Sequence, residues 1–372
     1  MKNRALQLLV QYAQVFQKCL FPRLEQELGP LGNTHRQLVT VLGLLNLEAA
    51  LGWQGRRVGR RPHSRLSLAR AFVAKAVLNL PTTRALIERI QVDVPLRRIC
   101  GWERVSQIPE ETIFSRAFAG FAGTELPQRV HAALIEKFEK DRLGGHISRD
   151  STAISARESV KKRAPVAAPV FPKAEPRRRR RKRGEPKAVI DMTRIERQAT
   201  GMPLAEMLAD LPRECAVGTK TNSHGRKETW RGYKLHLDVA DGQIPISAIL
   251  TSASLHDSQV AIPLATMSAQ RVVNLYDVMD SAYDCQHIAE YSRKLDHVPI
   301  IERLQRGKGL VPMLPHQAAR YRERTTVERV NSRLKDEFGG RFVRVRGHLK
   351  VMAHLMFGLL ALTANELLRC CT

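Results

Sequence analysis

Residues 321–335 have the sequence YRERTTVERVNSRLK, in which charged residues alternate with a few apolar ones. The stretch contains no Gly or Pro, which favours a helix. At about 100° per residue, four polar residues fall on one stripe of that helix, namely Tyr321, Arg324, Glu328 and Lys335. Four apolar residues fall on a second stripe about 100° away, namely Val327, Val330, Leu334 and Phe338. The helix is therefore expected to bury one side. The polar stripe is either a solvated surface or a set of residues that act together in the function of the protein.

The chain that contains this helix is strongly basic. Its 372 residues include 61 Lys and Arg against 36 Asp and Glu, which gives a net charge of +25. Hydrophobic residues make up 43%, which is ordinary for a soluble globular protein of two or three domains. A field of this sign attracts polyanions, and nucleic acid is the predicted partner because Lys and Arg release the counterions of its phosphates. An anionic membrane surface is the weaker alternative.

Cysteine usage and apolar segments bound the class of protein further. The six cysteines are scattered without a CxxC pair, so neither a disulfide framework nor a zinc site is expected, and a reducing compartment fits. The most apolar segment, LKVMAHLMFGLLALTANELL, is interrupted by Lys350, His354, Asn365 and Glu366. A buried helix is therefore predicted here rather than a membrane span.

The chain divides into three predicted parts. Residues 1–143 repeat apolar residues every three or four positions and form a helical N-terminal domain. Residues 144–345 form a second domain, with a basic insertion at about 156–190 in which residues 157–187 hold 13 Lys and Arg against three Glu. Such a segment cannot bury a core and is expected to be poorly ordered. Residues 346–372 form an apolar helix that packs on the second domain.

Within the second domain, strand patterns alternate with helix patterns. HISRDSTAIS is a predicted strand, and WRGYKLHLDVA and IPISAILTSAS are two more, joined by the turn residues Asp241 and Gly242. Asp257 is expected to cap the next helix, and RVVNLYDVMD and HVPIIERL are buried strands separated by a further helix. A hairpin followed by strand–helix–strand units predicts an α/β fold with a mixed sheet flanked by helices, preceded by the all-helical domain.

Three acidic residues occupy informative positions in this pattern. Asp150 lies within the first strand, Asp280 ends a later buried strand, and Glu328 belongs to the polar stripe. Carboxylates from separate elements can converge on hard divalent cations, and two such ions promote in-line phosphoryl displacement. Simpler interpretations stay open. Asp150 suits a turn, Asp277 competes with Asp280, and Glu328 suits a surface pair with Arg324.

In these residues the chain resembles the DDE transposases of bacterial insertion sequences, above all those with a Tyr-x2-Arg-x3-Glu-x6-Lys signature. Tyr321, Arg324, Glu328 and Lys335 keep every spacing of that signature. The second Asp of the family stands in an Asp-x-x-Tyr-Asp context, matched from Asp280 to Asp284, and the first in Asp-Ser-Thr, matched from Asp150 to Thr152. The segments KTNSHGRKETWRGYKLH and LHDSQ also resemble the family, as does the helical region near 65–135.

The resemblance implies a ribonuclease H-like catalytic domain that nicks the ends of a mobile element and joins the freed 3′-OH to target DNA. Asp150, Asp280 and Glu328 would hold two Mg²⁺ ions per active site, with Mn²⁺ as the alternative ion. Tyr321, Arg324 and Lys335 would contact DNA, which suits an Arg fork and a Lys point charge. The partners implied are the terminal inverted repeats, target DNA and a second copy of the chain in the DNA complex. The implied location is the bacterial cytoplasm, at the nucleoid.

Other features leave alternatives open. The basic run of the insertion either clamps DNA or is dispensable; it comprises Arg177, Arg178, Arg179, Arg180, Arg181, Lys182 and Arg183. Trp230 either stacks on a base or packs on the sheet. The N-terminal helices either recognise the terminal repeats or support dimerisation. A transposase relative that only binds DNA and a structure-selective nuclease on the same fold are the rival functions.

Overall fold

The computed structural model describes residues 4–52, 62–140, 142–160, 192–221, 225–303 and 312–369. The N-terminal region is helical, as predicted. Its elements are α1 (Arg4–Val15), the π-helical turn η1 (Phe16–Leu20), α2 (Phe21–Leu28), α3 (Asn33–Leu45), α4 (Leu47–Leu51), α5 (Arg65–Val77), α6 (Thr83–Val92), α7 (Val94–Cys100), η2 (Val105–Gln107), α8 (Glu111–Gly123) and α9 (Leu126–Glu139).

A six-stranded mixed sheet follows, which confirms the predicted fold class. Its strands are β1 (Leu143–Ser155), β2 (Ala216–Thr221), β3 (Lys227–Ala240), β4 (Ile244–Ser252), β5 (Val273–Met279) and β6 (Val298–Ile301). β1 pairs antiparallel with β3 on one side and parallel with β5 on the other, and β5 pairs parallel with β6. The far edge of β3 pairs with β2 along its first half and with β4 along its second half. β2 was not predicted from the sequence.

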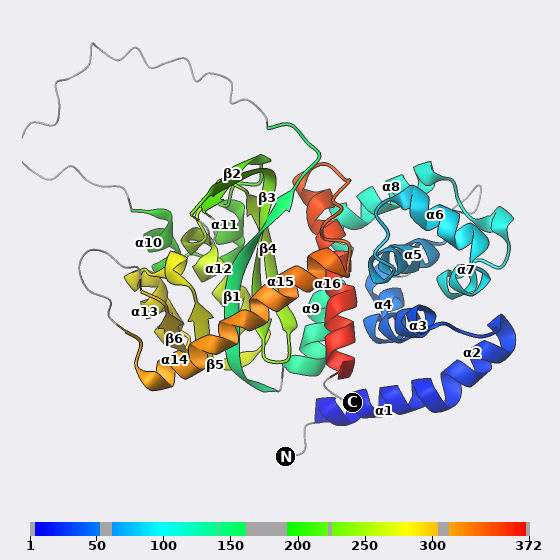
Figure 1. The fold of residues 1–372 in the computed structure, drawn as a ribbon, viewed down its shortest axis with the longest axis horizontal. Coiled ribbons are helices and arrows are strands. Elements are labelled where there is room, and N and C mark those ends of the chain that lie inside the picture. Colours follow the sequence, from blue (N-terminus) through cyan, green and yellow to red (C-terminus); the bar gives the residue numbers. More distant parts are fainter. Residues whose placement is uncertain are drawn as a thin grey trace, which may run out of the picture.

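Helices cover both faces of this sheet (Figure 1). One face carries α15 (Thr325–Asp336) against β1 and β3, and α16 (His348–Arg369) against β4. The other face carries α12 (Ser258–Ala269), which also contacts α10 (Arg194–Ala199), α11 (Leu204–Ala209) and α13 (Gln286–Lys294). The remaining elements are η3 (Ser281–Tyr283), α14 (Pro315–Tyr321) and η4 (Arg322–Arg324). The single helix expected from residue 321 is therefore divided at η4.

α16 joins the two parts of the molecule. It contacts β4 and α15 and also the N-terminal helices α3, α5, α8 and α9, and one hydrophobic core continues through all of them. By length and composition α16 could cross a membrane, but 83% of its apolar window is buried inside the protein, which agrees with the predicted buried helix. Close approach requires Gly358, since a Cβ there would lie 2.6 Å from the carbonyl oxygen of Phe338.

Candidate active site

Strand β1 directs alternate side chains to opposite faces of the sheet. Arg149 points to the α12 face, where its guanidinium donates to both carboxylate oxygens of Asp238 at 2.7 and 2.8 Å. Ser148 and Thr152 point to the α15 face, where the Ser148 hydroxyl donates to the Glu323 carbonyl at 2.9 Å and Thr152 accepts from Lys335 at 2.6 Å. Because side chains alternate along a strand, Asp150 lies on the α15 face.

Asp280 lies beside Asp150. The parallel register of β1 and β5 pairs Arg149 with Met279, so the residues that follow, Asp150 and Asp280, are neighbours at this point of the sheet. Asp280 ends β5, and its carboxylate accepts from the backbone N–H of Ala282 at 3.0 Å, which starts the η3 turn. Two acidic side chains that the sequence separates by 130 positions thereby meet.

Burial raises the pKa of both carboxyl groups. The pKa of Asp150 rises to about 7, because the group is withdrawn from water and faces the negative charges of Asp280 and Asp257. The backbone N–H of Ser151 and the charge of Arg324 oppose that rise. The pKa of Asp280 is also raised, mainly by burial. Arg324 offsets the negative charge of these two groups only in part, and a divalent cation would supply further positive charge.

Glu328 contributes the third carboxylate from α15. Two nitrogens of Arg324 donate to one of its oxygens, at 2.9 and 2.8 Å, and the carboxylate is half exposed. The surface pair that the spacing allowed is thus present. In the described part of the chain, no three His, Cys, Asp or Glu side chains are grouped closely enough to hold a metal ion. Convergence of Glu328 with Asp150 and Asp280 therefore remains a prediction.

Arg324 is the positive centre of this site. Its guanidinium interacts electrostatically with Asp150, Asp280 and Glu328, and its Nε donates to the Tyr321 hydroxyl at 3.2 Å. That hydroxyl in turn donates to Glu302 at 2.9 Å, a contact that the sequence did not predict. The polar stripe therefore faces the carboxylates of the sheet and is more than a solvated surface.

Asp257 is a further acid near this site, and it occupies the predicted N-cap position of α12. Its side chain makes no capping hydrogen bond to α12. It pairs instead with Lys234 of β3 at 2.9 Å, and it acts on the pKa of both Asp150 and Asp280. The ion pair with Lys234 is favoured over a capping hydrogen bond, because Lys234 would otherwise be a half-buried cation without a counter-charge. The LHDSQ motif, which contains Asp257, was the signal that could have identified it.

Asp277, the alternative to Asp280 in the sequence, is a buried residue with polar partners inside the protein. It is 2% exposed and lies within hydrogen-bond distance of His297 at 3.3 Å and Asn274 at 3.1 Å.

The basic run 177–183 lies outside the described residues. Trp230 covers Gly218 of β2 and donates its indole N–H to the Tyr233 carbonyl at 3.0 Å.

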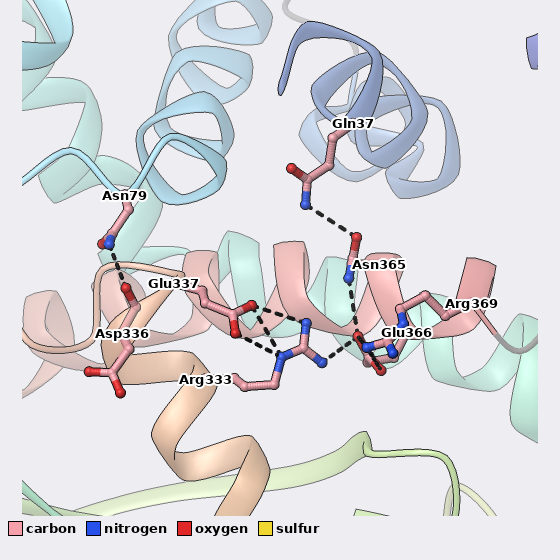
Figure 2. A network of polar contacts seen from close by, with 8 residues as sticks. All are labelled: Gln37, Asn79, Arg333, Asp336, Glu337, Asn365, Glu366 and Arg369. Atoms are coloured by element: carbon pink, nitrogen blue, oxygen red, sulfur yellow. Dashed lines mark hydrogen bonds and ion pairs between the residues drawn. The ribbon is translucent and has the colours of Figure 1, made fainter. Parts of the chain in front are cut away.

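Helix α15 is fixed at its C-terminal end by a network of polar contacts, which Figure 2 shows. Arg333 bridges Glu337 and the buried Glu366 of α16. Glu366 also accepts from Asn365, which accepts from Gln37 of α3 at 3.2 Å. These contacts connect the helix that carries Glu328 to both α16 and the N-terminal region.

Two protein families match the chain. A transposase DDE domain matches residues 182–364, and a transposase domain of the DUF772 type matches residues 23–119. The protein is a DDE transposase. The first match includes Asp280 and Glu328 and begins after Asp150. No curated protein and no solved structure matches the transposase. Its family implies phosphoryl-transfer catalysis on DNA and typically uses divalent metal ions.

Proposed function

We propose that the transposase cuts the ends of an insertion sequence and joins the freed 3′-OH to target DNA, with two Mg²⁺ ions held by Asp150, Asp280 and Glu328. The observation that carries this proposal is that Asp150 and Asp280 directly follow the paired residues Arg149 and Met279, on the sheet face covered by the helix that carries Glu328. Carboxylate oxygens suit Mg²⁺, with Mn²⁺ as the alternative ion. Two bound ions would activate the attacking oxygen and stabilise the leaving oxygen.

Arg324 has two roles in this proposal. In the metal-free protein its guanidinium neutralises Glu328 and partly neutralises the two aspartates. With Glu328 serving as a metal ligand, the same guanidinium would be free to hold a DNA phosphate near the cut with two parallel hydrogen bonds. Tyr321 orients Arg324, and Lys335 contacts DNA as a point charge beside β1.

The further assignments rest on charge and on the family. The proposed partners are the terminal inverted repeats and target DNA, with a homodimer in the DNA complex and a location at the bacterial nucleoid. Residues 1–143 are proposed to bind DNA or to dimerise, residues 144–345 to catalyse, and residues 346–372 to pack on the catalytic part. The proposal keeps Trp230 and the basic run 177–183 as DNA contacts, supported by the aromatic ring and by the run's positive charge.

A plasmid assay tests the chemistry. Supercoiled plasmid that carries the element's ends should be nicked and joined with Mg²⁺ and left intact with EDTA. Asp280→Ala should abolish both steps. Asp296→Asn is the matched control, because Asp296 lies in an exposed turn with a φ of 62°, which Asn tolerates. Cutting in EDTA, or full activity of Asp280→Ala, would contradict the proposal.

The same assay separates the rival functions. A DNA-binding relative without catalysis would shift the DNA and nick it under no metal condition. A structure-selective nuclease would cut, but it would not transfer precut ends to a target.

A further inference from the structure

A large cavity lies away from the acidic residues of the active site. Its volume is about 580 Å³, and it is bounded by α5 and α8 of the N-terminal region, by residues 338–346 after α15, and by α16. The cavity wall includes Phe342, a residue that is 37% exposed. The cavity is therefore lined by residues from both matched regions of the chain. Its lining contains none of the three acidic residues Asp150, Asp280 and Glu328, and no residue of the polar stripe.

The lining of this cavity is cationic. Five basic side chains line it, namely Lys75, Arg157, Arg344, Arg346 and Lys350. Within the described ranges none of the five makes an ion pair or a side-chain hydrogen bond, whereas many other arginines of the protein are paired. The acid of the lining, Glu111, is paired with Arg84. The positive charge of these side chains is therefore available to bind an anion.

Lys75 adds evidence from burial. It lies on α5 between buried residues, and burial lowers the pKa of its ammonium group to about 8. A half-buried ammonium group without a carboxylate partner is costly, and a phosphate at this position would offset that cost.

The cavity continues a line of cations that starts at the active site. Lys335, near the C-terminal end of α15, interacts electrostatically with Lys220 of β2 and with Arg341. Arg344 and Arg346 follow directly and line the cavity. The 12 residues of α15 span about 18 Å, or roughly five base-pair steps of about 3.4 Å. This spacing fits one continuous DNA strand that touches both places.

We propose that the cavity is a second DNA-binding site, which holds the sugar–phosphate backbone of the strand that leads away from the active site along α15. The proposal rests on the proposed function, because the direction of the strand is set by the position of the cut. The cations bind phosphates, and Phe342 offers an apolar surface to a deoxyribose ring.

Salt dependence of DNA affinity tests this site in the full-length protein. The triple variant Arg344→Gln/Arg346→Gln/Lys350→Gln removes three exposed cations without touching the core. Affinity for a duplex of about 30 base pairs is measured by fluorescence anisotropy in EDTA between about 50 and 200 mM salt. The single variant Lys350→Gln is compared with Arg293→Gln, which removes one exposed charge on α13, on the far side of the sheet (Figure 1).

Each lost phosphate contact should lower the slope of log affinity against log salt by about 0.9, so the triple variant should lose about 2.7. Over that salt range the wild type should then weaken roughly 40-fold more than the triple variant. Lys350→Gln should lose about 0.9 and Arg293→Gln close to zero. Equal slopes for the wild type and the triple variant, or equal losses for Lys350→Gln and Arg293→Gln, would overturn the proposal.

Competition distinguishes DNA from a small phosphate ligand. Millimolar deoxynucleoside monophosphate or inorganic phosphate should not displace the duplex from the wild type beyond its effect as salt. Displacement from the wild type but not from the triple variant would assign the cavity to a small anion and overturn the proposal. The plasmid assay reports on the proposed function separately. If the wild type does not nick DNA with Mg²⁺ but its duplex affinity still depends on the cavity residues, the proposed function fails and the second DNA-binding site stands.

Discussion

Asp150→Asn should stabilise the metal-free transposase at pH 8, although it removes a proposed metal ligand. Burial and the neighbouring carboxylates raise the pKa of Asp150 from 3.8 to about 7. The folded protein therefore holds this carboxylate in an unfavourable state whenever the group is ionised. An amide of the same shape carries no charge and avoids that penalty.

The sign and size follow from proton linkage. Well below pH 4, the folded and unfolded states both bind the proton, and the carboxyl group costs little stability. Between pH 4 and pH 7 only the folded state keeps the proton, so the free energy of unfolding falls as pH rises. Each pKa unit is worth about 1.4 kcal/mol, and a shift of roughly three units gives at most about 4 kcal/mol at pH 8.

Urea unfolding followed by circular dichroism, in EDTA at about pH 4.5 and pH 8, measures this difference. Burial also lowers the pKa of His131, His236 and His354. These histidines are present in both proteins, so their effect cancels when the variant is compared with the wild type. The advantage of Asp150→Asn should be small at the lower pH and reach a few kcal/mol at the higher one.

Asp210→Asn provides a control of opposite sign. Hydrogen bonding to Arg194, opposed by partial burial and aided by Arg197, lowers the pKa of Asp210. Its carboxylate therefore contributes stability that is present above its unfolded pKa and is lost as pH falls through the folded value. The Asn variant should be the less stable protein at pH 8. The reasoning is refuted if Asp150→Asn is no more stable than the wild type at pH 8, or if its advantage is the same at both pH values.

Three further substitutions test the structure around the site, each by urea unfolding. Asp238→Ala leaves Arg149 buried and unpaired and should cost about 3–5 kcal/mol, while Arg149→Met/Asp238→Leu should recover most of that loss; equal stability of the single and double variants would contradict this. Gly232→Ala should cost at least about 2 kcal/mol, because φ is +151° and a Cβ would lie 2.1 Å from a carbonyl oxygen of β1; an unchanged midpoint would show that β1 adjusts. Glu366→Ala should cost about 1–3 kcal/mol, because Arg333 keeps only its exposed partner Glu337, directly after α15; a loss no larger than that of an exposed glutamate would argue against the network in Figure 2.

The features that the sequence predicted well depend on local periodicity. The apolar stripe is an example: Val327, Val330 and Leu334 are fully buried, and Phe338 is 3% exposed. From β3 onward, the order of strands and helices also follows from patterns of a few residues. The turn at η4 was missed, because residues 322–324 contain no Gly or Pro to mark a change of helix type.

The features that could not be predicted depend on distant contacts. Asp257 does precede the first residue of α12, as local rules predicted, but its carboxylate pairs with Lys234 on another element. The pairing of Tyr321 with Glu302 likewise needs two segments to meet. The spacing of Arg324 and Glu328 did predict their ion pair, but it could not show that the same guanidinium faces Asp150 and Asp280.

The pair formed by Arg149 and Asp238 connects the fold to the chemistry. Both side chains are buried, at 1% and 0% exposure, and a buried ion pair contributes little net stability compared with a well-packed apolar pair. Its geometric effect is larger, because it joins opposite positions of β1 and β3. A slip of one residue would turn Asp150 to the α12 face and leave Arg149 facing α15. The ion pair therefore makes that slip costly, and it keeps Asp150 beside Asp280, where the proposed chemistry requires it.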